Sequence, residues 1–282
     1  MVLSEIEQSI KNKVEAIGKP LKEWDVKIYR GVLTGCNDAF IVSTAKRDEI
    51  LSNCKTEEER EKTREIFRPI LRGRDIKRYS YEWADLWLIA TFPSRHYDVE
   101  QYPALKQYLL SFGMERLEQS GKEYIVDGHR IKARKKTSNK WFETQDSISY
   151  WDDFQKHKII WKRIGSKIRF SYDCKGVLGL DSTCFATGSH IPYICCVLNS
   201  SMGHYLLQDA PRTGTGDLLI SVQAIEPVKI PPVPADEETF ETLVNEATAG
   251  HVSEIEETIE RLVFDLYGLN EDEREYIINN YR

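Results

Sequence analysis

Residues 158–173, KIIWKRIGSKIRFSYD, place two short apolar runs around a basic centre that contains one glycine. The first run, KIIWKRI, is typical of a buried strand, and KIRFSYD is a second strand candidate. Residues 181–187, DSTCFAT, add a third candidate. Residues 191–208, IPYICCVLNSSMGHYLLQ, have the length and apolar content of a core helix. The centre of the chain therefore combines short strands with an apolar helix.

The N-terminal part shows the same mixture of helix and strand signals. Ser4 can cap a helix over residues 4–17, with Glu7 three residues later as in a capping box. Residues 26–43 alternate apolar and polar side chains around a turn region, which predicts strand, loop and strand. Residues 56–67 are rich in helix formers and acidic at their start, which predicts a second helix.

The remaining segments complete an α+β fold with mixed short-strand sheets and packed helices. Residues 83–92, WADLWLIATF, are typical of a buried strand, and residues 102–119 of an amphipathic helix. Residues 122–140 are polar and basic, so we expect a long loop or a hairpin there. Residues 235–282 predict three acidic helices separated at glycines.

The charge of the chain is unevenly distributed. The net charge is −6, but residues 235–282 hold 14 acidic against 3 basic side chains, which leaves 36 basic and 31 acidic ones before them. Residues 60–80 contain 8 basic and 3 acidic groups, and residues 122–169 contain 13 and 6. Clustered positive charge suits a polyanion, because each neutralised phosphate releases condensed counterions. A solvated basic surface is the alternative.

Several catalytic and targeting signals are missing from the sequence. It contains no glycine-rich cofactor turn, no Asn/Asp-Pro-Pro-aromatic loop and no phosphate-binding P-loop. Its six cysteines include no C-x-x-C pair, which disfavours a zinc site. There is neither a signal peptide nor an apolar run of 18 residues, so we expect a cytoplasmic protein without membrane contact.

The basic segment ILRGRDIKRY, residues 70–79, offers a binding chemistry. Its arginines present guanidinium forks that match phosphate, and Gly73 lets the backbone approach a sugar-phosphate chain. Arginine also reads guanine through paired hydrogen bonds in the major groove. A salt-bridge cluster within the protein explains the same residues, and composition alone does not decide between these interpretations.

The order of motifs along the chain resembles the TaqI-like C-terminal specificity domain of Type IIG restriction-modification enzymes and adenine-specific DNA methyltransferases. The motifs are YRGVLTGCNDAFIV, IFRPILRGRDIKRY, LWLI, KWFETQ, KIIWKRIGSKIRFSYD, DSTCF, ICCVLNSSMGHYLL and VKIPP. The ending VFDLYGLNEDER is also similar to that family's tail. The resemblance extends from about residue 27 to the end of the chain.

The resemblance implies a double-stranded DNA recognition domain without catalysis of its own. It implies a linker helix over residues 1–24, a target recognition domain over residues 25–234 and an acidic helical segment over residues 235–282. Adenine methylation, and cleavage where it occurs, would belong to separate domains that use S-adenosylmethionine and Mg²⁺. The chain itself is expected to hold no cofactor or metal. Its expected partners are duplex DNA and a methyltransferase domain, either of the same parent protein or of a partner subunit.

The resemblance and the basic composition together select the candidate DNA-binding residues. Thr34 and Asn37 match the family's T-G-x-N loop, and the variable segment 122–139 contributes a basic cluster. The full set is Thr34, Asn37, Arg72, Arg74, Lys77, Arg78, Arg130, Lys132, Arg134, Lys135, Lys136, Lys140, Trp141, Lys162, Arg163, Arg212 and Thr213. Trp141 also suits a core position, and for Trp161 we expect the core.

Two other classes of function remain open at this stage. A divergent metal-dependent endonuclease would bring acidic residues together only in the fold, because no nuclease motif appears in the sequence. A protein-interaction module would use the acidic helices of residues 235–282 to dock a partner domain.

Overall fold

The two strand candidates of residues 158–173 pair with each other in the computed structural model of the protein, which describes residues 3–281. Strand β8 (Lys158–Lys162) lies antiparallel to β10 (Phe170–Asp173), and Trp161 stands opposite Phe170. On its other side β8 pairs with β12 (Thr183–Gly188), which pairs in turn with β2 (Val26–Arg30). The antiparallel order is β10-β8-β12-β2. All three strands expected from the centre of the sequence are confirmed.

The chain divides into two compact units that are not consecutive in sequence. Unit 1 contains the residues up to Gly31, Arg72–Glu82 and the residues from Asp153 onward. Unit 2 contains Val32–Leu71 and Trp83–Asp152. The three consecutive segments expected from the sequence are therefore not the units of this division, because the first helix and the acidic helices both pack within unit 1.

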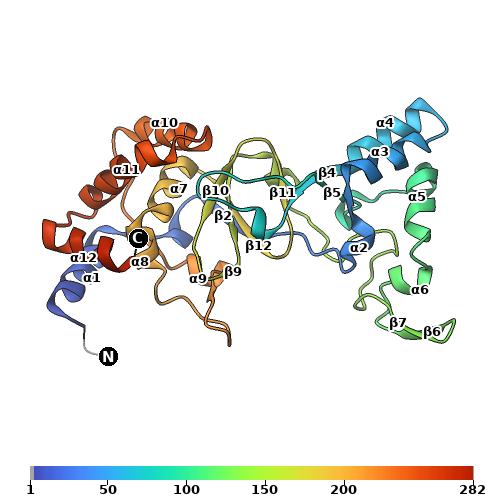
Figure 1. Ribbon diagram of the computed structural model, residues 1–282, viewed down its shortest axis with the longest axis horizontal. Helices are drawn as coiled ribbons and strands as arrows, with labels where there is room; N and C mark the ends of the chain where they lie inside the picture. Colours follow the sequence, from blue (N-terminus) through green and yellow to red (C-terminus); the bar gives the residue numbers. More distant parts are fainter. Residues whose placement is uncertain (1–2, 282) are drawn as a thin grey trace. The chain divides into compact units, whose positions relative to one another are not determined.

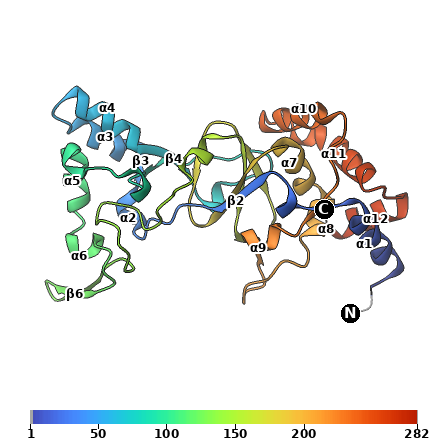
Figure 2. The same ribbon diagram turned by 180° about the vertical axis from the view of Figure 1, so that it is seen from behind.

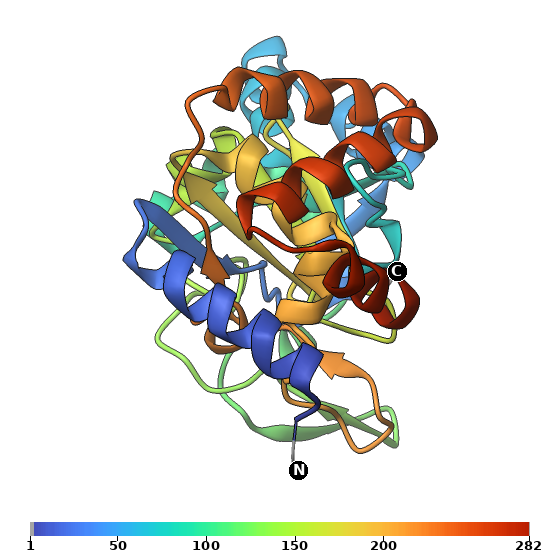
Figure 3. The same ribbon diagram turned by 90° about the vertical axis from the view of Figure 1, so that its left-hand side faces the viewer.

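Unit 1 is built in layers on the four-stranded sheet (Figure 3). Helix α7 (Ile191–Asn199) packs against β8, β10 and β12, and almost all of its residues are buried. Helices α10 (Glu237–Thr248) and α11 (Val252–Leu266) pack on α7 from the side away from the sheet. Their apolar faces join one core that includes Phe240, Ile259 and Val263. One acidic side chain of these helices, Glu260 of α11, is buried, and it accepts hydrogen bonds from the N–H and the hydroxyl of Ser201 at 2.8 and 2.9 Å. The other acidic side chains of α10 and α11 are exposed or half-buried.

The first and last helices of unit 1 pack against each other (Figure 3). Helix α1 (Glu5–Ile17) has the predicted capping box, in which Ser4 and Glu7 exchange hydrogen bonds. Its buried side chains are Ile10 and Val14. Helix α12 (Glu271–Tyr281) contacts both α1 and α8 (Ser201–Leu206).

A buried carboxylate, Glu273, links these terminal helices. Its side chain accepts hydrogen bonds from the Ser9 hydroxyl at 2.6 Å, the Lys13 ammonium at 2.6 Å and the backbone N–H of Asn270 at 2.8 Å. Burial alone would raise the pKa of Glu273, but these donors outweigh it and lower the pKa below the ordinary value. The carboxylate thus stabilises the folded state only while it is ionised.

Replacing Glu273 with Gln should lower the free energy of unfolding by about 2 kcal/mol near neutral pH, because hydrogen bonds to a charged group are lost. The pKa of Glu273 is lower in the folded state, so the wild type should lose this contribution as the pH falls below about 4.5. Urea unfolding at pH 7 and pH 4 should therefore show a smaller difference between variant and wild type at the lower pH. An equal difference at both values would contradict this role.

The core helix expected over residues 191–208 is two helices, which is a correction to the prediction. Helix α7 ends at Asn199, and Ser200 takes an extended conformation in which its hydroxyl accepts a hydrogen bond from the N–H of Gly203. Ser200 is thus the N-cap of α8, and it interrupts the helical path. The backbone at Gly203 lies so close to Leu198 that a Cβ there would stand 2.4 Å from the Leu198 carbonyl oxygen.

The other short elements of unit 1 connect its strands and helices. Strand β1 (Lys19–Pro20) pairs with β14 (Lys229–Ile230), and β9 (Ile164–Gly165) pairs with β13 (Leu218–Leu219). The remaining elements are β11 (Leu178–Gly179), α9 (Val222–Ile225) and the 3-10 turns η1 (Leu21–Glu23) and η2 (Gly73–Asp75). A further 3-10 turn, η5 (Trp151–Gln155), precedes β8.

Unit 2 contains a small antiparallel sheet flanked by helices (Figures 1 and 2). Strand β5 (Leu86–Ile89) pairs with β3 (Ile41–Ser43) and β4 (Phe67–Leu71). The helices are α2 (Asn37–Phe40), α3 (Thr44–Ser52), α4 (Glu57–Ile66), α5 (Pro103–Leu110) and α6 (Met114–Leu117), with 3-10 turns η3 (Pro93–Arg95) and η4 (Val99–Gln101). The helix expected over residues 102–119 is interrupted between Leu110 and Met114, where Gly113, the N-cap of α6, takes a φ of 83°.

The basic segment that follows α6 begins with a β-hairpin. Strand β6 (Glu123–Val126) pairs antiparallel with β7 (His129–Lys132), and irregular backbone follows up to residue 150. The α+β fold class is confirmed, as is the core position of Trp161. Among the helices of residues 3–281, none combines the length and the apolar character that crossing a bilayer requires.

Candidate functional site

The basic turn of residues 72–75 is held in shape by one ion pair. The Arg72 backbone N–H and its side-chain Nε both donate to one carboxylate oxygen of Asp75, at 2.8 and 3.0 Å, and the second guanidinium nitrogen donates to the other oxygen at 2.7 Å. Burial would raise the pKa of Asp75, but the bonds from Arg72 outweigh it and lower the pKa. The Arg72 fork is thus engaged within the protein, and it fixes the turn that presents Arg74.

Gly73 brings this turn onto the neighbouring strand. Its N–H donates to the Ser182 hydroxyl at 3.0 Å, and a Cβ at Gly73 would stand 2.9 Å from Cγ of Lys162. Only a residue without a side chain lets the turn approach the end of β8 this closely. Arg74 and Lys162, both exposed, therefore come from distant parts of the sequence to one place in unit 1.

A hollow of about 210 Å³ lies at this place. Eight described residues line it, and four of them are basic while none is acidic: Gly73, Arg74, Ile76, Lys162, Gly165, Ser166, Lys167 and Arg169. Four positive charges around one small concavity attract an anion, and the Ser166 hydroxyl adds a hydrogen-bonding group. Two of the four basic side chains, Lys167 and Arg169, lie in the connection between β8 and β10.

A second hollow of about 530 Å³ shares Ser166, Lys167 and Arg169 with the first. It is also lined by Arg78, His204 and Arg212, and its described lining again contains no acidic residue. The name basic surface is used from here on for Arg74, Lys162, Lys167, Arg169 and Arg212. This surface belongs entirely to unit 1.

The other candidates of unit 1 have partners within the protein. The Arg78 guanidinium forms an ion pair with Glu256 of α11 and donates to the carbonyl oxygen of Asn199 at 2.7 Å. Lys77 lies 3.2 Å from the Glu82 carboxylate at the surface. Arg163 is half-buried, and Thr213 lies in the exposed turn after Arg212. Arg78 therefore fixes α11 against the end of α7.

Most candidates of unit 2 lie in the hairpin β6–β7 or in the irregular segment after it. Arg130 and Lys132 stand on β7 with exposed side chains, and Lys135 and Lys136 are exposed beyond it. The Arg130 guanidinium pairs with Glu123 across the hairpin, with one hydrogen bond of 2.8 Å. Four exposed cations thus lie within seven residues of the chain.

Arg134 differs from these neighbours because its side chain is only 2% exposed. Its guanidinium donates to four backbone carbonyl oxygens, those of Leu117, Thr34, Glu143 and Trp141, at 2.6 to 2.9 Å. Burial lowers its pKa to about 10, so it remains charged at neutral pH. The structure therefore gives Arg134 a role inside unit 2, where it binds the loop at Thr34, the end of α6 and residues 141–143. Its guanidinium is fully engaged by these carbonyl groups and does not face DNA.

The loop candidates Thr34 and Asn37 are linked to each other. Thr34 is fully buried, and its hydroxyl donates to the side-chain oxygen of Asn37 at 2.7 Å and accepts from the N–H of Cys36 at 3.1 Å. Asn37 is exposed. Lys140 is exposed above the Phe142 ring, and Trp141 is half-buried against the same ring. Thr34 therefore shapes the loop, while Asn37 faces outward.

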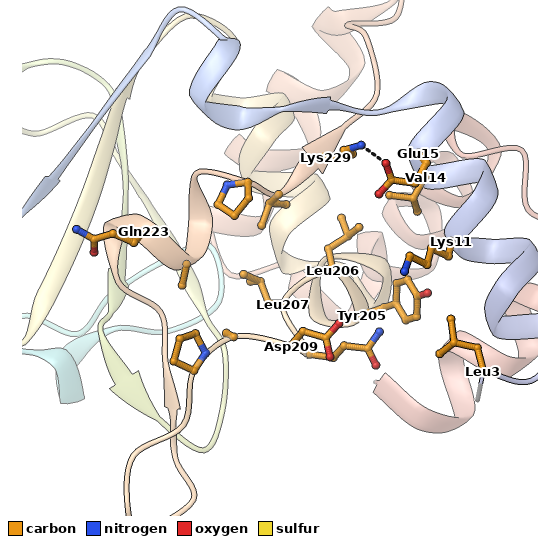
Figure 4. A pocket seen from close by; sticks show the side chains of 16 residues that line it. Leu3, Lys11, Val14, Glu15, Tyr205, Leu206, Leu207, Asp209, Gln223 and Lys229 are labelled. Atoms are coloured by element: carbon orange, nitrogen blue, oxygen red, sulfur yellow. Dashed lines mark hydrogen bonds and ion pairs between the residues drawn. The ribbon is translucent and has the colours of Figure 1, made fainter. Parts of the chain in front are cut away.

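Another cavity of about 390 Å³ lies between α1 and the segment that follows α8 (Figure 4). Apolar side chains such as Val14 and Leu206 form part of its lining. Lys229 forms an ion pair with Glu15 across its edge (Figure 4). Its lining contains both acidic and basic residues, so it lacks the excess of positive charge that distinguishes the basic surface.

Sequence reasoning missed Lys167 and Arg169 as site residues. Both lie in the segment GSKIRF, which the sequence pattern assigns to a strand. The one signal that pointed to them was the excess of basic residues within residues 122–169. Across residues 3–281, no three His, Cys, Asp or Glu side chains are grouped as ligands of a metal ion would be.

Comparison with known proteins gives a family and a fold. The family model of the TaqI-like C-terminal specificity domain matches residues 68–218. The structure is similar to the Type IIL restriction-modification enzyme MmeI in complex with DNA, with a TM-score of 0.56 and 11% identity over 94% of this chain and 36% of that one. It is also similar to the type IIG restriction endonuclease BpuSI, with a TM-score of 0.51 and 13% identity over 86% of this chain and 28% of that one. No curated protein matches the sequence. The chain thus spans about a third of the length of these two enzymes.

Proposed function

Because the chain belongs to the family of TaqI-like C-terminal specificity domains, we propose that it binds double-stranded DNA and recognises a short base sequence. The observation that carries the proposal is the basic surface of unit 1. Its five cations come from three separate segments, and the hollows that they line contain no acidic residue among the described ones. A protein with a net charge of −6 concentrates positive charge there, which is what binding to a phosphate backbone requires.

The two units supply different parts of the proposed contact. In unit 1, Arg74, Lys162, Lys167, Arg169 and Arg212 bind phosphates and fix the position of the duplex, because they surround concavities rather than project from them. In unit 2, exposed side chains at the start of α2, on the hairpin and in the segment after the hairpin contact bases or phosphates. These are Asn37, Arg130, Lys132, Lys135, Lys136 and Lys140.

The remaining candidates support these contacts from inside the protein. Arg72 shapes the turn that carries Arg74, and Arg78 holds α11. Lys77, Arg163 and Thr213 lie next to the basic surface in the sequence and provide secondary phosphate contacts. Trp141 packs edge-on against the Phe142 ring, over which Lys140 lies, and adds an aromatic face near the proposed interface.

Methylation or cleavage of the recognised DNA is assigned by this proposal to domains outside the chain. The chain supplies sequence recognition, and a methyltransferase domain of the parent protein or of a partner subunit modifies an adenine with S-adenosylmethionine. Where cleavage occurs, Mg²⁺ acts in a nuclease domain. Such a system operates on DNA in the cytoplasm.

The test is selection from randomised duplexes. The purified chain should retain DNA at low salt, and sequencing of the bound fraction should show an enriched short motif. If each of the five cations of the basic surface neutralises one phosphate, the logarithm of affinity should fall with the logarithm of salt concentration with a slope of about −4.5. Fluorescence anisotropy with the selected duplex measures this slope.

Three other results have distinct meanings. Retention without an enriched motif would show phosphate binding and contradict sequence recognition by this chain alone. Absence of retention would contradict the proposal. Cleavage of plasmid DNA in the presence of Mg²⁺ would show a nuclease and contradict the assignment of catalysis to other domains.

A further inference from the structure

The hairpin β6–β7 of unit 2 has one face toward the protein and one toward solvent. Tyr124, Val126 and Ile131 are partly buried, and they alternate with residues that are exposed. In the observed register Ile125 stands opposite Arg130, and Glu123 opposite Lys132. Residues directly opposite in an antiparallel pair lie on the same face, so these four side chains form the outward face.

A tight turn fixes this register. Asp127 and Gly128 join the strands with φ angles of 49° and 78°, and two consecutive positive φ values are characteristic of a type I′ turn. This turn suits the twist of the two strands, so the hairpin projects as a preformed ribbon. The outward face is therefore presented without rearrangement of its own backbone.

Ile125 is an unusual residue for an outward face. Its side chain is 82% exposed, whereas the other exposed large apolar side chains among the described residues range from 36% to 40%. An isolated isoleucine on the solvent face of a two-stranded ribbon contributes nothing to a core, and it is a position that charged residues ordinarily occupy. An apolar side chain this exposed on a projecting ribbon is available for contact with a partner.

The charge around Ile125 indicates the chemistry of that partner. Residues 122–136 contain six basic and two acidic side chains, and of the basic ones Arg134 alone is buried. Arg130 stands next to Ile125 on the same face, where its ion pair with Glu123 holds it in place. A preformed ribbon with an exposed apolar side chain among cations is complementary to a groove of duplex DNA.

We propose that hairpin β6–β7 enters the major groove of the DNA that the chain recognises and that Ile125 contacts the methyl group of a thymine there. The inference rests on the proposed function and adds the element and the residue that read one base pair. The major groove is about 12 Å wide, which admits a two-stranded ribbon, and the thymine methyl is its one apolar feature. Arg130 and Lys132 face the groove edges, where phosphates or guanine accept their hydrogen bonds.

The experiment compares the wild type with Ile125→Ala and with Met114→Ala as a matched control. Met114 is also an exposed apolar residue of unit 2, but it stands on α6 outside the hairpin. Each protein is used for selection from randomised duplexes, and affinities are then measured on the motif that the wild type selects. Single thymines in this duplex are also replaced by uracil, which removes only the methyl group.

The expected result is a loss of preference at one A·T base pair in the Ile125→Ala selection, with about fivefold weaker binding to the wild-type motif. Uracil at that position should weaken wild-type binding about fourfold and leave binding of Ile125→Ala unchanged. Met114→Ala should retain both the motif and the affinity of the wild type.

The inference is overturned if Ile125→Ala selects the full motif with unchanged affinity, or if the lost position is a G·C pair. A uniform loss of affinity for all sequences, together with increased fluorescence of 2-aminopurine placed in the duplex, would indicate a minor-groove wedge and would also overturn it. In each of these cases the wild type still selects a motif, so the proposed function stands. A wild type that retains no DNA would instead contradict the proposed function itself.

Discussion

Replacing Arg134 with Met is expected to lower the free energy of unfolding of unit 2 by about 4 kcal/mol or more. The substitution leaves four backbone carbonyl oxygens in a buried site without the donors that now satisfy them. Each unsatisfied buried acceptor costs roughly 1 to 3 kcal/mol, and water that enters the space recovers part of this loss. Hydrogen exchange of the backbone amides of unit 2, residues 32–71 and 83–152, measures this loss of stability.

Two variants distinguish this role from a contact with DNA. Lys135→Met removes an equal charge from the adjacent exposed position and should leave stability unchanged. Arg134→Lys keeps the charge, but an ammonium lacks the planar fork that reaches four acceptors, so stability should still fall by several kcal/mol. If Arg134→Met retained wild-type stability and instead lost affinity for DNA, the internal role described for this residue would be refuted.

Removing charge from the basic surface should have the largest effect on DNA binding. In the triple variant Arg74→Gln, Lys162→Gln and Arg169→Gln, affinity at about 0.1 M salt should fall roughly 100-fold. The slope of log affinity against log salt should become shallower by about 3, because three phosphate contacts are lost. The loss should be similar for all sequences, since phosphate contacts carry no sequence information. Salt titrations with the selected duplex and with an unrelated one measure both quantities.

A matched control separates local charge from total charge. Lys22, Lys27 and Lys175 are exposed cations of unit 1 that do not line either hollow of the basic surface. Their triple replacement with Gln changes the net charge by the same amount and should leave affinity and salt slope close to those of the wild type. If both triple variants weakened binding equally, the net charge rather than the basic surface would account for the affinity.

The elements of the fold were largely predictable from local sequence signals. The capping box at Ser4 and Glu7 and the apolar run at residues 158–162 each mark an element whose boundary depends on nearby residues only. The division of residues 191–208 into two helices was not predicted, because Ser200 is as compatible with a helix surface as with an N-cap. The close approach of the Gly203 backbone to Leu198, which accompanies the break, is not visible in the local sequence.

The candidate site was predictable as a composition but not as a geometry. Arg134 and Lys135 are indistinguishable in a basic stretch, yet one satisfies four carbonyl groups in the interior while the other faces solvent. Likewise, Arg72 and Arg74 are separated by one glycine, and the buried carboxylate of Asp75 engages only the first. Such differences depend on contacts between segments that are distant in the sequence, which a local pattern does not contain.

The interrupted path of the chain through unit 1 has a consequence for folding during synthesis. All of unit 2 lies between residues 32 and 152, so a ribosome has produced every residue of it before it begins the second half of unit 1. Strand β2 has no partner in its sheet until β12 emerges, since Arg30 pairs with Cys184. Domains generally fold as units as they are produced, N-terminal ones first. Unit 2, with its hairpin, can therefore fold while β2 still lacks its partner strand β12 and the turn at residues 72–75 still lacks its contact with Ser182.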